Sequence, residues 1–474
     1  MENSSHAQPN LQFLSIEQCE RIHRSAIEIL RKTGVRIFHP EALHLLDQAG
    51  CTVLEDNLVL FPPVLVEWAV RQPPSGITLC RRGSQEAAAP LCGRNVNFGT
   101  GSDCPNIIDP KTGEHRQFTL DDLSKVVRLV DALPELNFAM SSGIPSDYSG
   151  KSYRKQYSVM IKNTIKPVVF VCDDGEDCER IINAAACVAG GLDKLQLNPT
   201  LLLYSEPSTP LQHSKTALEK LLIMADNKIP VVHSPAPMMA GTAPVTLAGG
   251  LAVGAAEALS GLVIHQLKQP GAPFVFGSGL HHLDMRTSIS VYGAPEFQLA
   301  RLAIADLGRF YSLPTWGYAG HSDACIFDEQ AASDSLFSVM NALQSGTNLV
   351  HDVGYLEAGL SCSPEMIVYS AEMISMLTHF NAGFSIDTDS LALDVVHAVG
   401  PGGNFMTEDH TLERFRDYWE PRLFSRRRFE AWQDAGGRRL GEYLREKTVD
   451  MMDTAAGTPL DDSLVQEVEY ILEV

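Results

Sequence analysis

The densest group of potentially reactive side chains lies between residues 313 and 332, in the stretch LPTWGYAGHSDACIFDEQAA. This stretch holds His321, Asp323 and Cys325, and all three residue types are ligands of zinc or other transition metals. Zinc sites, however, usually combine paired Cys or His ligands from two separate segments. The same side chains also suit a polar loop at the end of a strand, so both interpretations stand at this point.

A second metal hypothesis uses histidines from distant segments, His233, His282 and His351. The chain has no His-Glu-x-x-His motif, and the adjacent pair His281–His282 would point apart in a strand. Cys325 and His321 form a nucleophile–base pair only along the chain. We therefore expect no bound metal and assign no certain catalytic acid, base or nucleophile.

These residues belong to a longer pattern of short apolar runs with high strand propensity. From residue 95 onward, eight such runs start about 30 to 45 residues apart, which is the length of one strand, loop and helix. Eight strand–helix units in succession predict an α/β protein with a TIM-type (β/α)8 barrel. The runs begin at Val96, Leu136, Pro167, Leu201, Pro230, Pro273, Pro314 and Asn348.

The same pattern divides the chain into three parts. Residues 1–94 predict an N-terminal extension of helices and a hairpin, in which Ser15 and Gln18 form a capping box. Residues 95–390 are expected to form the barrel. Residues 391–474 lose the strand pattern and predict a C-terminal helical segment packed on the barrel.

Composition excludes several classes of protein. The formal net charge of −21 disfavours nucleic acid as a partner. Residues 1–10 show neither a basic start nor an apolar run, and the apolar stretch 243–267 contains Glu257 and His265, which favours a buried helix over a membrane span. The ten cysteines form no C-x-x-C pair. We expect a cytoplasmic protein that does not contact membranes.

The expected carboxyl ends of the strands are rich in aromatic residues, methionine and histidine, and nearly empty of Lys and Arg. Barrels place their chemistry at this end. A mouth that binds phosphates or polycarboxylates usually provides several cations. The composition of this mouth therefore predicts a neutral or cationic ligand.

Three long segments resemble the trimethylamine methyltransferase superfamily: GHSDACIFDEQAA, GTNLVHDVGYLEAGL and GPGGNFMTEDHTLERFRDYWEPRLFSRRRFEAW. The resemblance covers nearly the whole chain. It implies transfer of a methyl group from an amine to the Co(I) of a corrinoid (cobalamin) carried by a cognate partner protein. The trimethylamine branch of this superfamily carries pyrrolysine, whereas this chain contains only standard residues. The resemblance therefore implies the branch that acts on quaternary amines, similar to glycine betaine–corrinoid protein methyltransferases.

A quaternary nitrogen already carries a positive charge, so its methyl group can be displaced directly and no acid or base is strictly required. The protein must then hold the cation, orient one methyl group and exclude water. Aromatic faces near strand ends are the candidates for a cation cage, and a carboxylate on the substrate would need donors. Glu206 could add negative potential. The cage candidates are Phe98, Tyr204, Phe276, Trp316, Tyr318 and Phe384, and the donor candidates are His351, His282 and the backbone around Gly277 and Gly279.

Two other functions are compatible with the sequence. The first is a barrel that binds a quaternary amine without catalysis, and the second is a zinc-dependent corrinoid methyltransferase. A homo-oligomer is also compatible with the sequence, and methylamine or one-carbon metabolism is the expected setting. An assay of methyl transfer from a panel of quaternary amines to Co(I) would separate these functions.

Overall fold

The computed structural model describes residues 6–474 and shows a mixed α/β fold. Residues 1–5, half of the stretch that shows neither a basic start nor an apolar run, lie outside the described part. Each of the eight predicted runs contains a strand. One four-stranded parallel sheet has the order β10 (Leu136–Phe138), β7 (Asn97–Gly99), β20 (Leu349–His351) and β19 (Trp316–Tyr318). The other has the order β11 (Val168–Phe170), β12 (Leu201–Ser205), β14 (Val231–His233) and β16 (Phe274–Val275).

The two sheets meet at both of their edges through single parallel bridges, Ala139–Val168 and Phe276–Thr315. Regular pairing stops at these two seams, so residues 6–474 contain two parallel sheets and no continuous closed sheet. The prediction of one closed barrel sheet is therefore met only at the level of an α/β fold with eight parallel strands. The strands flanking the seams are two or three residues long, which leaves little ladder to extend across them.

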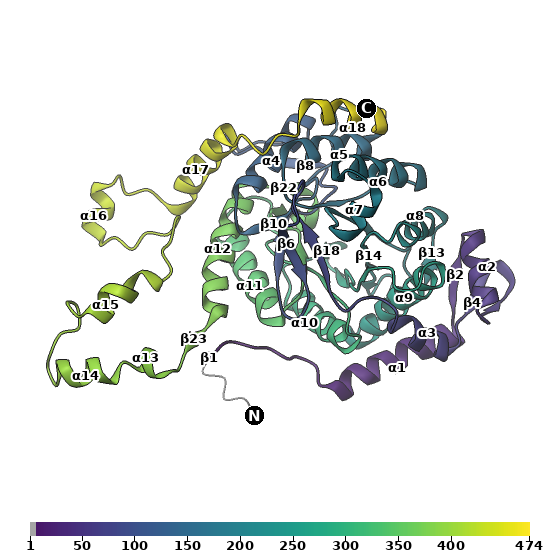
Figure 1. Ribbon diagram of the computed structural model, residues 1–474, viewed down its shortest axis with the longest axis horizontal. Coiled ribbons are helices and arrows are strands. Elements are labelled where there is room, and N and C mark those ends of the chain that lie inside the picture. The colour runs from purple at the N-terminus through teal and green to yellow at the C-terminus, as the bar shows by residue number, and fades with distance from the viewer. Residues whose placement is uncertain (1–5) are drawn as a thin grey trace.

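Helices between the strands surround the two sheets, as Figure 1 shows. Side chains along each strand alternate between an outer face packed on these helices and an inner face. In β11, for example, Val168 and Phe170 belong to the outer core and Val169 to the inner one. The surrounding helices are α4 (Leu120–Ala132), α5 (Ser152–Asn163), α6 (Gly175–Ala189), α7 (Leu192–Leu197), α8 (Lys215–Asp226), α9 (Leu247–Lys268), α10 (Pro295–Phe310), α11 (Glu329–Ser345) and α12 (Pro364–Ala382).

Helix α9 is long and apolar enough to cross a membrane by length and composition alone. However, 78% of its apolar window is buried inside the molecule. Two of its polar residues, Glu257 and His265, are also fully buried. The helix therefore has the environment of a core helix, which agrees with the sequence-based expectation for this stretch.

The first helix of the N-terminal extension is α1 (Ile16–Lys32), whose capping box pairs Ser15 with Gln18 as predicted. A left-handed Gly34 (φ +75°) follows the helix, and a side chain there would collide with the carbonyl oxygen of Val59. The predicted hairpin is also present. The remaining elements are β2 (Val35–Ile37), α2 (Pro40–Gln48), β3 (Thr52–Val53), β4 (Leu58–Leu60) and α3 (Pro63–Val70).

A second hairpin, β5 (Ile77–Cys80) with β6 (Ala87–Leu91), was not predicted. It covers the amino ends of the parallel strands, because Asn97 and Asn137 donate side-chain hydrogen bonds of 3.0 and 3.2 Å to carbonyl oxygens of β6. Its apolar side chains share one core cluster with inner-face residues such as Leu202. The hairpin thus blocks the amino end of the inner space and leaves the carboxyl end for ligands.

Short strands in the loops build small additional sheets. At the carboxyl ends of the parallel strands lie β8 (Asn106–Ile108), β9 (His115–Gln117), β13 (Gln212–His213), β15 (Met238–Met239), β17 (His281–Asp284), β18 (Ile289–Val291), β21 (Tyr355–Leu356) and β22 (Ser361–Cys362). These strands fix the loops that carry the functional side chains.

The C-terminal segment was expected to pack on the body as a whole, and the structure differs. Helices α17 (Leu440–Thr454) and α18 (Asp462–Leu472) lie on the body, where Lys162 pairs with Glu469 at 2.6 Å. Residues 384–439, which we call the arm, project from it (Figure 1). The arm starts at β23 (Phe384–Ser385), which pairs with β1 (His6–Ala7), and contains α13 (Thr388–Leu391), α14 (Leu393–Val399), α15 (Asp409–Arg414) and α16 (Phe429–Asp434).

Candidate active site

A cluster of aromatic rings occupies the carboxyl end of the inner space. Trp316 and Tyr318 come from β19, Tyr204 from β12 and His351 from β20. The His351 ring stacks on Trp316 with centroids 4.2 Å apart, and Tyr318 lies 4.2 Å from His351 on another side. Tyr204 completes the cluster at 5.3 Å from Trp316 and 5.6 Å from His351. The structure therefore brings together four side chains that the sequence singled out.

Two glycines make room for these rings. A Cβ atom on Gly277 would lie 2.7 Å from the Cβ atom of Trp316, and one on Gly279 would lie 2.7 Å from the hydroxyl of Tyr318. Real Cβ atoms do not approach other atoms so closely, so larger residues would displace the rings. Gly277 and Gly279 therefore lie behind the cluster, and we propose that they position its rings.

Three carboxyl groups lie next to the aromatic cluster. The hydroxyl of Tyr204 donates a hydrogen bond to Glu206. Asp352 follows β20 in a left-handed conformation (φ +76°), which is uncommon for a non-glycine residue, and its Oδ1 lies 2.7 Å from Nδ1 of His351. Asp103 accepts hydrogen bonds from Ser102 at 2.8 Å and from Tyr153 at 3.1 Å. The site is therefore rich in negative charge.

The surroundings of Glu206 make its ionisation costly. Its side chain is accessible from the open mouth but is enclosed by protein atoms, and this desolvation raises the pKa of the carboxyl to about 7. The nearby Asp103 and Asp352 raise the pKa further, whereas the hydrogen bond from Tyr204 lowers it. Burial likewise raises the pKa of Asp103. A cation bound between these groups would relieve the mutual repulsion.

Several buried polar atoms in the same region have no hydrogen-bond partner among the described residues. They are Nε1 of Trp316, Nε2 of His351 and both ring nitrogens of His321, of which one can donate when the ring is neutral. Burial lowers the pKa of His321 to about 4, so its ring is neutral near pH 7. Because buried polar groups in proteins are almost always paired, these atoms point to a ligand with acceptor oxygens.

Two residues of α10, Phe297 and Arg301, support the cluster, and sequence reasoning missed both. Arg301 lies over the rings of Phe297 and Tyr318 at 4.4 and 4.6 Å. It also donates to the carbonyl oxygens of Ser278 at 2.7 Å and Leu280 at 2.5 Å. Phe297 and Arg301 are four residues apart and share a helix face, a signal that the sequence did contain. We expected the mouth to be nearly empty of Lys and Arg, and Arg301 places a buried cation beside the aromatic cluster.

Three of the predicted cage residues do not join the cluster. Phe98 and Phe276 point outward, because Asn97 and Val275 occupy the inner face and side chains alternate along a strand. Phe276 packs against Tyr311 instead, with centroids 5.1 Å apart. Phe384 is exposed in β23 of the arm. His282 lies in β17, half-buried, with an unpartnered Nδ1.

The structure separates His321, Asp323 and Cys325, which lie close together in the sequence. His321 faces the aromatic cluster, 5.2 Å from Phe297. Asp323 accepts backbone hydrogen bonds from Tyr292 and Gly293 at 2.8 and 2.9 Å and ties two loops together, whereas Cys325 is exposed. Among residues 6–474, no group of three His, Cys, Asp or Glu side chains is arranged to hold a metal ion.

His233, from the distributed metal hypothesis, lies outside the site. It faces outward from β14, and its Nε2 lies 3.1 Å from Nδ1 of His213. The second nitrogen of His213 contacts Ser260 at 2.8 Å, and burial lowers the pKa of His213 to about 3. These two neutral histidines form a satisfied core pair, away from His282 and His351.

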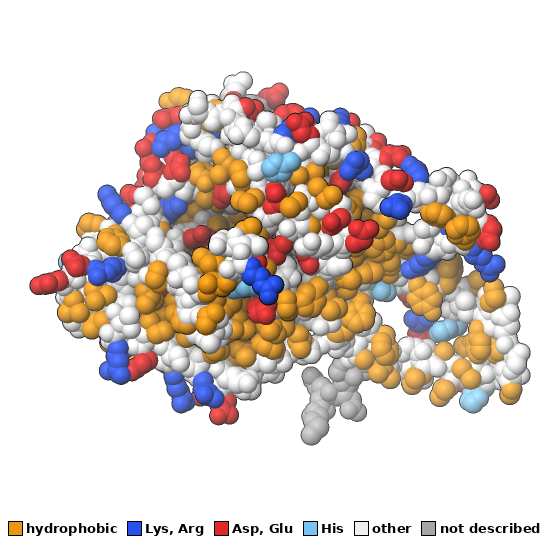
Figure 2. Space-filling model, turned by 180° about the vertical axis from the view of Figure 1, so that it is seen from behind, with side chains coloured by type: hydrophobic (Ala, Val, Ile, Leu, Met, Phe, Trp, Pro, Cys, Tyr) orange, Lys and Arg blue, Asp and Glu red, His pale blue; other side chains and the backbone are white. Residues whose placement is uncertain are grey.

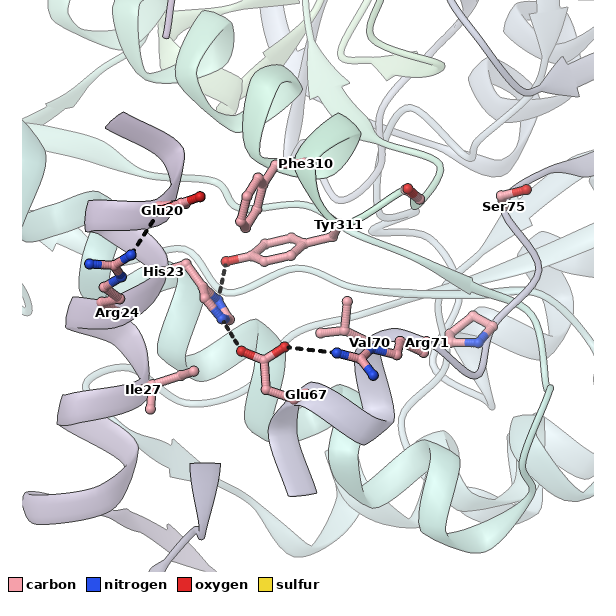
Figure 3. Close-up of a pocket in the computed structure, with 12 residues that line it drawn as sticks. Glu20, His23, Arg24, Ile27, Glu67, Val70, Arg71, Ser75, Phe310 and Tyr311 are labelled. Carbon is pink, nitrogen blue, oxygen red and sulfur yellow. Dashed lines mark hydrogen bonds and ion pairs between the residues drawn. The ribbon is translucent and has the colours of Figure 1, made fainter. Parts of the chain in front are cut away.

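A surface pocket of about 700 Å³ lies where α1, α3 and the end of α10 meet (Figure 3). His23 bridges the hydroxyl of Tyr311 at 3.2 Å and the carboxylate of Glu67 at 2.9 Å. The pocket lies near the amino ends of the strands, because the loop after α10 leads into β19. Its central polar groups bond to one another, so the aromatic cluster is the stronger candidate.

The chain matches the family model of trimethylamine methyltransferase (MTTB) over residues 1–472. The protein belongs to the trimethylamine methyltransferase family. Among curated relatives, it is 30% identical to trimethylamine methyltransferase MttB of Desulfitobacterium hafniense over 97% of this chain and 93% of that protein. It is also 30% identical to a glycine betaine methyltransferase of the same species, over 90% of this chain and 89% of that one.

Solved structures show the same fold at low sequence identity. The monomethylamine methyltransferase MtmB of Methanosarcina barkeri has a TM-score of 0.52 and 11% identity, and the match covers 96% of this chain and 90% of that chain. This likeness concerns the fold alone. The family resemblance read from the sequence is confirmed, and the absence of pyrrolysine places the chain with members built from standard residues.

Proposed function

We propose that this family member is a methyltransferase that takes a methyl group from a betaine-type quaternary amine and delivers it to the Co(I) of a corrinoid protein. The observation that carries the proposal is the ring cluster of Tyr204, Trp316, Tyr318 and His351 with Glu206 and Asp352 beside it. A trimethylammonium group donates no hydrogen bonds, so rings and carboxylates are the groups that can bind it.

The unpartnered donors supply the second half of a betaine site. A betaine carries a carboxylate a short distance from its cation, and Trp316 Nε1, His351 Nε2 and the neutral His321 ring all lack partners. Backbone around Gly277 and Gly279 remains a further candidate. A tertiary amine without a carboxylate would leave these donors unpaired, at a cost of about 1–3 kcal/mol for each buried group.

In the proposed reaction, the carbon–nitrogen bond breaks and the nitrogen keeps both bonding electrons, leaving as a neutral tertiary amine. The corrinoid partner supplies the Co(I) nucleophile that accepts the methyl cation. This chain holds the cation against the rings, keeps water away and directs one methyl group toward the mouth. We further infer that the two parallel sheets act as halves of one eight-stranded barrel, whose carboxyl end opens to the partner.

The test is a panel of glycine betaine, proline betaine, carnitine, choline and trimethylamine, each supplied with Co(I) corrinoid protein and followed by cobalt spectroscopy. We expect transfer from a carboxylate-bearing quaternary amine and none from trimethylamine. Transfer from trimethylamine alone would refute the proposal. Binding of a betaine without transfer to any acceptor would favour the non-catalytic alternative.

A further inference from the structure

A chain of buried hydrogen bonds connects the end of β12 to α9 through two histidines. Oγ of Ser205 lies 3.3 Å from Nδ1 of His233, and Nε2 of His233 lies 3.1 Å from Nδ1 of His213. Nε2 of His213 lies 2.8 Å from Oγ of Ser260, which donates to the carbonyl oxygen of Glu257 at 2.9 Å. Each of these residues is at most 2% exposed. Histidines that reach the surface in Figure 2 are scattered, whereas these two stack in the core with ring centroids 5.2 Å apart.

This chain of bonds has one direction. Burial lowers the pKa of His213 to about 3 and that of His233 well below its usual value, so each ring carries a single N–H near pH 7. Because the Ser260 hydroxyl donates to a carbonyl oxygen, His213 donates from Nε2 and accepts at Nδ1. His233 then donates from Nε2 and accepts at Nδ1 from the Ser205 hydroxyl. In the opposite direction, the buried Ser205 hydroxyl would have no acceptor among residues 6–474, which is unfavourable.

The chain of bonds holds the start of the loop that carries Glu206. Ser205 is the last residue of β12, so its bond to the histidines fixes the backbone directly before Glu206. The far end of the loop is held as well, because the N–H of Leu211 donates to Oε1 of Glu257 at 2.6 Å. Glu257 and Ser260 are three residues apart on one face of α9. A single helix face therefore holds both ends of this loop.

The N-terminal extension holds the same loop from another side. Strand β13 follows the loop and pairs in parallel with β2. The N–H of Arg36 donates to the carbonyl oxygen of Leu211 at 3.0 Å, and the N–H of Phe38 donates to that of His213 at 3.1 Å. The loop is therefore fixed by distant parts of the chain, although Glu206 itself faces the open mouth.

We propose that a set of buried residues behind β12 positions Glu206 for the bound cation. We call this set the clamp, and it consists of Ser205, His213, His233, Glu257 and Ser260. The inference rests on the proposed function, because it names what directs the carboxylate beside the quaternary amine. A carboxylate on a loose loop has to be ordered when the cation binds, and this ordering lowers affinity. A loop with both ends fixed beforehand avoids that loss.

The clamp costs stability, so packing of the core alone does not explain it. Glu257 is fully buried and has no ion-pair partner among residues 6–474, and burial raises the pKa of its carboxyl to about 7. Apolar residues of similar volume would remove this cost. The carboxyl group instead bonds to Leu211, in the loop that carries Glu206. The chain thus holds a costly group at the place where it fixes the position of Glu206.

Carboxyl NMR titration of the ligand-free protein tests the clamp without any substrate. In the wild type the pKa of Glu206 is about 7, and the charged groups that face it are Asp103, Asp352 and Lys220. The variant Glu257→Met removes the acceptor of the loop N–H and leaves those charges in place. We expect the pKa of Glu206 to fall by about one unit or more, because a released carboxylate reaches solvent. Glu257→Gln keeps an acceptor oxygen and should retain the wild-type pKa.

Calorimetric titration with tetramethylammonium measures the effect on cation binding. This probe has no carboxylate, so it reports on the cation site alone. Its Kd should rise about tenfold in Glu257→Met and in Ser205→Ala, and by less than about twofold in Glu257→Gln. The control His265→Leu removes another fully buried side chain of α9, two turns further along and packed on Phe274 at the start of β16. It should keep the wild-type Kd despite a similar loss of thermal stability.

NMR correlation of the ring nitrogens supplies a spectroscopic signature of the clamp. His213 and His233 should both be the neutral Nε2–H tautomer from pH 6 to 8. The opposite tautomer in either ring would overturn the proposal, because the Ser205 hydroxyl would then not be held. Ser205→Ala removes one hydroxyl only, and it decides the titration if Glu257→Met does not fold.

Two further results would overturn the proposal. One is an unchanged pKa of Glu206 in the clamp variants, and the other is an equal loss of cation affinity in His265→Leu, which would reflect stability alone. None of these measurements involves methyl transfer. A wild type that binds neither tetramethylammonium nor a betaine would refute the proposed function, whereas the titration of Glu206 still decides whether the clamp positions this carboxylate.

Discussion

Replacing Glu206 with Gln removes one negative charge from the aromatic cluster and retains the size of the side chain. A bound trimethylammonium group in contact with Tyr204 would lie about 5 Å from this carboxylate, because cation–π contacts place the cation within about 6 Å of a ring. At an effective dielectric constant of about 20, this separation gives an attraction of about 3 kcal/mol. Solvent reaches Glu206 through the mouth, and screening reduces the loss to about 1–2 kcal/mol, or roughly tenfold in Kd.

The same group predicts a pH dependence of binding. With a pKa of about 7, Glu206 is mostly protonated at pH 6 and mostly ionised at pH 8, and a cation binds the ionised form more tightly. Affinity of the wild type should therefore rise over this interval, and the Glu206→Gln variant should lose most of that rise. Without ligand, the raised pKa makes the folded state lose stability as the pH climbs from about 4.5 through 7. A cationic ligand should then raise Tm more at pH 8 than at pH 6.

Calorimetric titration with glycine betaine and with choline at pH 6, 7 and 8 measures both effects. The variant Glu55→Gln provides a matched control, because Glu55 is exposed in the N-terminal extension, outside the strands and loops that form the mouth. We expect the control to titrate like the wild type. Wild-type affinity and an unchanged pH profile in Glu206→Gln would refute the reasoning that this carboxylate stabilises the bound cation.

Further outcomes follow from other contacts. His351→Ala should weaken betaine binding more than choline binding in the same titrations, and equal losses would show that His351 is not the carboxylate anchor. Trp316→Phe removes the unpartnered N–H but keeps a ring, so betaine affinity should fall by about 1 kcal/mol more than choline affinity. Chelators should leave methyl transfer intact, and elemental analysis finding about one zinc per chain would instead revive the zinc-dependent alternative. Arg154→Leu removes the 2.6 Å partner of buried Asp177, which then keeps only the half-exposed Lys151 at 3.4 Å, and should lower stability by about 3 kcal/mol in denaturant melts; a near-neutral effect would contradict this.

The positions of the eight strands could be predicted from the sequence because each run is apolar, short and bounded by turn residues. The directions of side chains could not, since strands buried on both faces show no alternation of polar and apolar residues. Tyr204 and Trp316 face the inner space, whereas Phe98 and Phe276 are equally aromatic and lie on the opposite face. Only the register of the neighbouring residues distinguishes the two cases.

Other features depend on contacts between distant segments. Arg301 reads as an ordinary helix residue until α10 packs behind β19 and brings it over Tyr318. The hairpin β5–β6 has unremarkable residues, and its role appears only where it meets the strand ends of β7 and β10. The arm has helix-forming segments like any surface region, and the sequence does not reveal that they lack an intramolecular partner.

The hairpin that covers the amino ends of the strands has a kinetic consequence. In the proposed reaction, the amine and the methyl acceptor would then both approach through the carboxyl end, and an acceptor bound there would block the route to the amine site. Steady-state kinetics should therefore be of compulsory order, with the amine entering first and the demethylated amine leaving last. An acceptor that arrives early would trap an empty enzyme, so excess acceptor should inhibit turnover in competition with the amine. The closed amino end therefore predicts a fixed order of substrate binding and product release.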